Sequence, residues 1–322
     1  MSPKTQIVTG AAGFIGSRLV DRLLALGHDV VGLDNLSRGR REHLVEAETT
    51  GRFRLIELDL IDETALDAAL AAAGPVDTVW HLAANSDIPA GVADARIDWR
   101  DTFMTTFAVV EAMKRHAIPR IVFASTSAVY GALDQVLDET TGPLLPISNY
   151  GAMKLAGEAA ISAAAESHLS QAVICRFPNV VGPRATHGVI YDLVGKLLGQ
   201  ARELEVLGDG RQCKPYLHVS ELVEAMIHLW STQTERRVLC NIGPEDDGAT
   251  VRVIAEAVVE AAGGGTPLRY TGGDRGWLGD VPRVRYNVDR LKTTGWSPSL
   301  SSEDAVRRAA REVAAERGLI PA

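Results

Sequence analysis

The stretch Gln6-Ile-Val-Thr-Gly10-Ala-Ala-Gly13-Phe-Ile-Gly16 places three glycines where an apolar run gives way to a helical pattern. Gly10 permits a tight turn, Gly13 lets a pyrophosphate approach the backbone, and Gly16 allows close packing of a helix that we expect to begin near Ser17. The N-terminus of such a helix offers free N–H groups and a positive dipole end to an anion. The spacing therefore predicts a dinucleotide-binding turn.

An acidic residue follows at the distance that such a turn requires. Asp34 ends the next apolar run, 24 residues after Gly10, where a carboxylate can accept hydrogen bonds from an adenosine ribose. It would repel a 2′-phosphate, so the sequence favours NAD over NADP. Arg38, Arg40 and Arg41 lie just beyond and leave NADP open as the alternative.

Short apolar runs alternate with helical segments through the first 180 residues. The runs are apolar on both faces, as in strands of a covered parallel sheet. This alternation predicts an α/β fold, a doubly wound parallel Rossmann sheet with a smaller mixed α/β C-terminal substrate domain. We expect residues 1–178 to form the NAD-binding domain and residues 179–322 the substrate-binding domain, with segments near 216–243 returning to the first. The predicted strands are Gln6–Gly10, Val30–Asp34, Leu55–Asp59, Val76–Ala84, Arg120–Thr126 and Ala172–Phe177.

Composition excludes several classes of partner. The net charge is −8 over 322 residues, which argues against a nucleic-acid or anionic-membrane surface. No apolar run approaches the roughly 20 residues of a membrane helix. The three cysteines have no disulfide or metal-ligand spacing, and no secretory segment stands at the N-terminus, so we expect a cytoplasmic protein without a metal.

Two groups of residues indicate the chemistry. Ala124–Gly131 (ASTSAVYG) ends a predicted strand with the hydroxyls of Ser125, Thr126 and Ser127. Tyr150 and Lys154 stand four apart in a helical segment, so both side chains share one face. A nearby ammonium favours the phenolate and is expected to lower the pKa of Tyr150, which could then take a proton from a sugar hydroxyl.

Together these features resemble the extended short-chain dehydrogenase/reductase family, and within it the UDP-sugar 4-epimerases of the NAD-dependent epimerase/dehydratase group. The resemblance implies bound NAD, a UDP-sugar substrate and a homodimer formed through the helices at 102–116 and 150–166. The motifs that carry it are Gly10-x-x-Gly13-x-x-Gly16, Asp34, Asp59-Leu60, His81–Asn85, Tyr150-x-x-x-Lys154, Arg176–Pro183, Gly208–Ala225, Asn241–Gly243 and Gly295–Pro298.

Roles follow from the resemblance, position by position. It implies that Thr126 binds the sugar C4 oxygen, that Tyr150 is the general base and then acid, and that Lys154 binds the nicotinamide ribose. The implied cofactor contacts are Gly10, Gly13, Phe14, Ile15, Gly16, Asp34, Asn35, Asp59, Leu60, Leu82, Ala83, Ala84, Tyr150 and Lys154. The implied substrate contacts are Ser86, Thr126, Ser127, Tyr150, Asn179, Lys214, Tyr216, Arg275 and Asp280.

The residues after Thr126 separate related reactions. Dehydratase relatives carry Asp-Glu there, because loss of water across C5 and C6 needs an acid and a base. Ser127 and Ala128 can supply neither. Inversion at C4 through a 4-keto intermediate remains, with a 4-ketoreductase or 4,6-dehydratase as the alternative. Ser127 and the small Val284 leave the sugar open among glucose, glucuronate and N-acetylglucosamine types.

Several positions depart from the family pattern. Thr102 replaces an asparagine, and Lys214 replaces an arginine on the diphosphate, which keeps the charge but loses bidentate geometry. Trp277 stands where relatives carry another arginine, so either Arg275 reaches the diphosphate or the nucleotide is held differently. We interpret His81 as a packing histidine.

Overall fold

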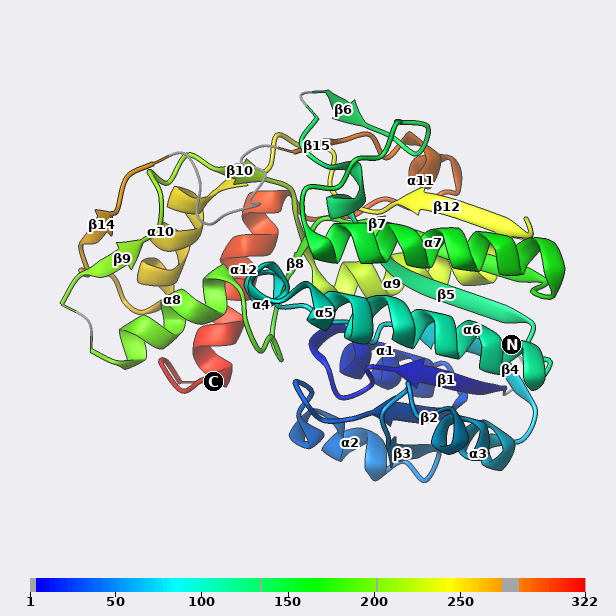
Figure 1. Cartoon of the computed structure of the whole chain (residues 1–322). Helices are drawn as coiled ribbons and strands as arrows, with labels where there is room; N and C mark the ends of the chain where they lie inside the picture. Colours follow the sequence, from blue (N-terminus) through cyan, green and yellow to red (C-terminus); the bar gives the residue numbers. More distant parts are fainter. Residues whose placement is uncertain (1–3, 134, 201, 274–283, 322) are drawn as a thin grey trace. The chain divides into compact units, whose positions relative to one another are not determined.

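The computed structural model describes residues 4–133, 135–200, 202–273 and 284–321, and the chain divides into two compact units (Figure 1). Unit 1 comprises Met1–Gly131, Pro143–Arg176 and Met226–Cys240. Unit 2 comprises Ala132–Gly142, Phe177–Ala225 and Asn241–Ala322. The chain therefore leaves the first unit after Arg176 and returns to it within one helix, α9 (Val219–Thr232).

The centre of unit 1 is a seven-stranded parallel sheet in the order β12-β7-β5-β4-β1-β2-β3. This order confirms the predicted doubly wound sheet, because the chain runs outward from β1 in one direction and then in the other. The strands are β1 (Thr5–Thr9), β2 (Asp29–Asp34), β3 (Phe53–Glu57), β4 (Val76–His81), β5 (Arg120–Thr126), β7 (Gln171–Phe177) and β12 (Arg237–Asn241).

Two predicted strands end earlier than expected. β4 stops at His81, after which the Leu82 N–H is shared between the Thr9 carbonyl and the Thr9 hydroxyl, and the Ala83 N–H donates to that hydroxyl. β3 stops at Glu57, and in the turn that follows the Asp59 carboxylate accepts from the Ile61 N–H.

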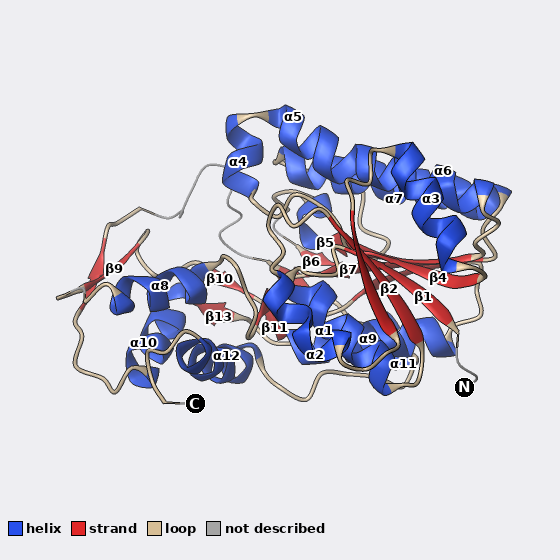
Figure 2. Ribbon diagram, turned by 90° about the horizontal axis from the view of Figure 1, so that it is seen from below, coloured by secondary structure: helices blue, strands red, loops and turns tan. Residues whose placement is uncertain are grey.

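Helices cover both faces of this sheet (Figure 2). On one face α3, α6 and α7 enclose a core with Ile7, Val79 and Phe123. On the other face lie α1 and the part of α9 that belongs to unit 1. Besides its part of α9, the α-helices described in unit 1 are α1 (Phe14–Ala25), α2 (Val45–Glu48), α3 (Glu63–Ala73), α4 (Ile88–Ala93), α5 (Ala95–Asp98), α6 (Thr105–Arg115) and α7 (Asn149–Ser167).

The helix starts follow from capping chemistry. Side-chain oxygens of Asp62 and Ser148 accept main-chain N–H bonds at the starts of α3 and α7. Helix α1 begins at Phe14, three residues before the predicted start, because the Ser17 N–H already bonds to the Gly13 carbonyl. Gly13 gives α1 no side-chain cap, so the first N–H groups of α1 remain available to a ligand.

A π-helical segment, η2 (Trp99–Met104), joins α5 to α6. Such wide turns are rare and occur mostly at functional sites. Two 3₁₀ turns also lie in this unit, η1 (Arg41–Leu44) and η3 (Ser127–Tyr130).

Unit 2 has its own core. It forms where α8, α10 and α12 pack around Val194, Ile254 and Val306. Three short strand pairs contribute to it, β8 with β11, β9 with β14 and β10 with β13, and a fourth pair, β6 with β15, lies apart from it. The bounds are β6 (Val136–Leu137), β8 (Asn179–Val181), α8 (Val189–Leu198), β9 (Leu204–Val206), β10 (Cys213–Lys214), β11 (Tyr216–His218), β13 (Ala249–Thr250), α10 (Val251–Ala261), β14 (Leu268–Tyr270), β15 (Arg285–Tyr286), α11 (Asp289–Thr293) and α12 (Ser302–Glu316).

In the part of the chain that the structure describes, no helix combines the length and the apolar character that crossing a bilayer requires.

Candidate active site

The glycine turn after β1 has a shape that only glycine allows. Gly10 has a φ of +68°, and a Cβ there would lie 2.9 Å from the Ala83 nitrogen. A Cβ on Gly16 would collide with the Gly10 carbonyl. Phe14 and Ile15 form the first turn of α1 and are half-buried. A narrow turn that ends in an uncapped helix fits the pyrophosphate of a dinucleotide.

Asp34 fixes this turn at the end of β2. Its carboxylate accepts hydrogen bonds from the Ala12 N–H at 2.9 Å and the Leu36 N–H at 2.8 Å. Burial raises the pKa of Asp34, while these two main-chain donors lower it. Asn35 comes next, is exposed, and accepts from Ser37.

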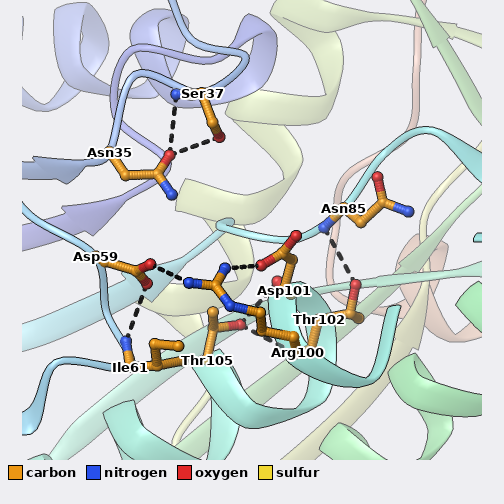
Figure 3. A network of polar contacts seen from close by, with 9 residues as sticks. All are labelled: Asn35, Ser37, Asp59, Ile61, Asn85, Arg100, Asp101, Thr102 and Thr105. Carbon is orange, nitrogen blue, oxygen red and sulfur yellow. Dashed lines mark hydrogen bonds and ion pairs between the residues drawn. The ribbon is translucent and has the colours of Figure 1, made fainter. Parts of the chain in front are cut away.

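Figure 3 shows polar side chains from loops after three strands and from η2. Arg100 of η2 donates to Asp59 at 2.5 Å and also bonds to Asp101 (Figure 3). The sequence singled out Asp59 and its buried neighbour Leu60, but not Arg100. The signal available was a basic residue on the helical segment that follows β4.

The loop after β4 is tied to η2. The Asn85 N–H donates to the Thr102 hydroxyl at 3.1 Å, and the Asn85 side-chain amide donates to Asp98 at 2.8 Å. Thr102 is buried and serves as a structural acceptor. Of the other predicted residues here, Leu82, Ala83 and Ala84 are half-buried and Ser86 is exposed.

His81 is held neutral between two threonines. Thr9 accepts two main-chain N–H bonds, so its own hydrogen goes to His81 Nδ1 at 2.7 Å. The Thr106 hydroxyl donates its hydrogen to the Thr102 carbonyl, so His81 Nε2 must donate to the Thr106 oxygen, at 3.0 Å. Burial, together with the charge of Lys154, lowers the pKa of His81 to about 3. The packing role predicted for His81 is confirmed.

Thr126 and Tyr150 meet at the junction of β5 and α7. Thr126 is the last residue of β5, and Tyr150 lies in the first turn of α7. Burial raises the pKa of Tyr150 to about 12, a side-chain hydrogen bond with Thr126 lowers it, and the charge of Asp98 raises it. Ser127 follows in η3 and is half-buried.

Lys154 lies one helical turn after Tyr150 and is 2% exposed. Its Nζ donates to the Ala124 carbonyl at 2.7 Å and stands 4.8 Å from the Phe123 ring centroid and 5.9 Å from that of Tyr150. Burial lowers the pKa of Lys154 to about 7, while Glu158 raises it. The expected lowering of the Tyr150 pKa is not found, because burial raises it.

The other predicted substrate residues belong to unit 2 and form their own group. Asn179 and Tyr216 are register partners in the β8–β11 pair; Asn179 is exposed and Tyr216 buried. Lys214 lies on β10 and is half-buried. Arg275, Trp277 and Asp280 lie outside the described residues.

A family model described as the NAD dependent epimerase/dehydratase family matches residues 6–243. The chain belongs to this family. The NAD-dependent epimerase/dehydratase family uses the cofactor that Asp34 and the glycine turn predicted, and the resemblance drawn from the sequence is confirmed.

Three relatives within the epimerase/dehydratase family illustrate the likeness. A curated UDP-glucose 4-epimerase of Azospirillum brasilense is 32% identical, over 96% of this chain and 91% of its own. A solved UDP-galactose 4-epimerase is 36% identical, with a TM-score of 0.84 over 97% and 99% of the two chains. The UDP-glucose 4-epimerase of Thermus thermophilus, in complex with NAD, is 28% identical, with a TM-score of 0.86 over 98% and 100%.

Proposed function

We propose that this chain is an NAD-dependent UDP-sugar 4-epimerase that inverts C4 of a UDP-hexose through a transient 4-keto sugar. The observation that carries the proposal is the meeting of Thr126 with Tyr150, one turn before the buried Lys154 and in the same unit as the glycine turn. The names of the relatives support it.

In the proposed reaction Thr126 holds the C4 oxygen of the sugar while Tyr150 takes the proton of the C4 hydroxyl. When bound, NAD supplies the hydride acceptor and donor and a positive ring charge that favours the Tyr150 phenolate. Lys154 donates hydrogen bonds and adds positive charge beside Tyr150. After the 4-keto sugar turns over, C4 would regain its hydride on the opposite face and Tyr150 would return the proton to the C4 oxygen, so no net oxidation or reduction occurs.

The cofactor would be held by the residues around β1, β2 and β4. The turn from Gly10 to Gly16, with Phe14 and Ile15, would hold the pyrophosphate, and Asp34 and Asn35 the adenosine ribose. Asp59 and Leu60 would contact adenine, with Arg100 orienting the Asp59 carboxylate. Leu82, Ala83 and Ala84 would line the cofactor channel.

The residues that we propose as substrate contacts are Ser86, Ser127, Asn179, Lys214, Tyr216, Arg275 and Asp280. UDP-glucose is the first substrate to test, because the cited relatives are named for it or for its C4 epimer. Ser127 can donate to a C6 carboxylate, which keeps UDP-glucuronate as the second, and the small Val284 keeps UDP-N-acetylglucosamine as the third.

A 4,6-dehydratase is the weaker candidate for this site, because neither Ser127 nor Ala128 can protonate a leaving C6 hydroxyl. A 4-ketoreductase would use the same Thr126 and Tyr150, but would consume added NADH or NADPH stoichiometrically.

We also propose a homodimer formed through η2, α6 and α7, and a cytoplasmic location. Trp99 and Phe107 are 52% and 44% exposed on the outer side of η2 and α6, and burial of such side chains stabilises association. Cys175, Cys213 and Cys240 are free thiols, which fits a reducing compartment.

The test is incubation of the purified protein, without added cofactor, with UDP-glucose, UDP-glucuronate or UDP-N-acetylglucosamine. NMR of the products should show the C4 epimer of one of them. A 4-keto-6-deoxy sugar would establish the dehydratase instead, and turnover only with added NADH or NADPH the ketoreductase.

A matched pair of variants tests the assigned base. Tyr150→Phe removes the proton acceptor and should lower kcat by at least about 1000-fold, with NAD still bound. Tyr270→Phe, which removes a hydroxyl from β14, should leave kcat unchanged. Turnover by Tyr150→Phe at the rate of the parent would reject Tyr150 as the base.

A further inference from the structure

A second group of charged residues is buried behind Lys154, and the proposed reaction does not use it. Glu158 follows Lys154 by one turn of α7 and is 6% exposed. Arg176 lies inside β7 and is 3% exposed. Charged side chains are almost never buried this fully unless they are paired, so this group needs a physical reason.

The two side chains form a bidentate pair. Arg176 donates to Glu158 through Nε at 2.9 Å and through Nη2 at 2.6 Å. The Ser125 hydroxyl at the end of β5 donates to the same carboxylate. The guanidinium of Arg176 also lies over the Tyr130 ring, 4.8 Å from its centroid. Glu158 is thereby fixed in position.

The two charges of the Glu158–Arg176 pair are placed differently with respect to Lys154. Residues four apart on a helix are neighbours, so the carboxylate of Glu158 lies on the stripe of α7 that carries Tyr150 and Lys154. Arg176 reaches Glu158 from another element, the strand β7. The negative member of the pair is thus the one that shares the stripe with Lys154.

Lys154 needs such a partner because burial disfavours its charge. Its Nζ lies over the Phe123 ring and donates to a main-chain carbonyl; both contacts favour the ammonium, but neither carries a formal negative charge. His81, on β4, is neutral. The titratable groups that face Lys154 are Tyr150 and Glu158 of α7 and His81 of β4. Three further groups act on it indirectly, through Glu158 or Tyr150: Arg176 of β7, Tyr130 of η3 and Asp98 of α5.

We propose that Glu158, held by Arg176 and Ser125, is a positioning residue that keeps Lys154 protonated beside Tyr150. A buried ion pair gives little net stability and is often replaceable by apolar residues. Its presence here is explained by the electrostatic requirement of its neighbour. The inference rests on the proposed function, because protonated Lys154 matters through its effect on Tyr150.

The direct test measures the titration of Lys154 itself. The chain has six lysines, so selective ¹³C labelling of the lysine Cε gives a small set of NMR signals. The signal of Lys154 is the one absent from a Lys154→Met variant. We expect it to titrate near pH 7 in the parent protein.

Three variants should give an ordered result. Glu158→Gln removes the attractive charge and leaves Arg176 repelling Lys154, so the pKa of Lys154 should fall by about one unit or more. The double variant Glu158→Gln with Arg176→Gln removes both charges, so its Lys154 pKa should lie between those of Glu158→Gln and the parent. Glu166→Gln, an exposed site at the end of the same helix, should leave the pKa unchanged.

If Glu158→Gln does not fold, the double variant still allows the measurement, since the double variant leaves neither charge of the pair buried without its partner. An unchanged Lys154 pKa in the double variant, or in a folded Glu158→Gln, would overturn the proposal. Glu158→Asp, which keeps the charge, should recover most of the parent value; a pKa equal to that of Glu158→Gln would also overturn it.

The pH dependence of turnover separates this inference from the proposed function. In Glu158→Gln the loss of Lys154 protonation should begin at lower pH, so the falling limb of kcat should move to lower pH. If the parent epimerises no UDP-sugar, the proposed function fails while the lysine titration still decides the role of Glu158. If the parent is active and the titrations coincide, only the role of Glu158 fails.

Discussion

Asp98 is a buried carboxyl group that acts against the proposed base. One of its oxygens accepts from Asn85, and the other is packed where a side chain on Gly91 would otherwise be. Burial raises the pKa of Asp98, and its negative charge in turn raises the pKa of Tyr150. The same η2 junction that fixes the loop after β4 therefore also sets the acidity of the site.

Asp98→Asn should shift the activity to lower pH. The variant keeps an oxygen for Asn85 but removes the negative charge, so the pKa of Tyr150 falls. Turnover requires the phenolate, so the rising limb of kcat/KM should move down by about one pH unit. Asp192→Asn, on α8, is the control and should not move it. A shift to higher pH would contradict the assignment of Tyr150 as base.

At the scale of the element, α7 aligns the three side chains to which we assign roles. Tyr150, Lys154 and Glu158 follow one another at intervals of four and form one stripe facing β5 and η3. The close approach depends on Gly151, where a Cβ would lie 2.6 Å from the Ala128 carbonyl oxygen of η3. The distance between Tyr150 and Thr126 is thus set by the absence of a side chain at residue 151.

Gly151→Ala should impair catalysis although alanine is the better helix former. The added methyl would push the first turn of α7 away from η3 and separate Tyr150 from Thr126. We expect kcat to fall by about 10- to 100-fold, with NAD affinity measured by calorimetry nearly unchanged. In Gly195→Ala of α8 the nearest atoms belong to the flexible Arg317 side chain, so thermal stability should stay equal or rise. Parental kcat in Gly151→Ala would show that this contact does not position Tyr150.

The sequence predicted elements better than it predicted what joins them. The doubly wound sheet, the glycine turn and Asp34 followed from local patterns of apolar residues and glycine. The π-helical η2 did not, because no short pattern distinguishes it from an α-helix. Arg100 and Glu158 were missed since their partners, Asp59 and Arg176, are distant in sequence. A charged residue inside the apolar run Ala172–Phe177 was the one available sign of a buried pair.

At the scale of the whole molecule, an aromatic stripe marks the expected contact between two copies of the chain. Trp99, Phe103 and Phe107 recur every four residues along η2 and α6, and the rings of Phe103 and Phe107 are 6.3 Å apart. Exposed aromatic side chains in a row are typical of an interface core.

Phe107→Glu should convert the dimer to a monomer. The carboxylate would be buried without a partner at the centre of the contact, at a cost of several kcal/mol. Light scattering after size exclusion should show half the parental mass. Val45→Glu, at an apolar site on α2 that is more exposed than Phe107, should keep the parental mass. A parent that is monomeric, or a Phe107→Glu variant that stays dimeric, would reject this interface.

The path of the chain through the central sheet determines how late in synthesis that sheet can be completed. Strand β12 joins the sheet beside β7, yet 59 residues separate the end of one from the start of the other. Until residues 237–241 have left the ribosome, β7 is an open edge with unpaired main-chain groups. Unit 1 therefore cannot be completed before much of unit 2 has been made, and a fragment ending near residue 178 would be prone to aggregate.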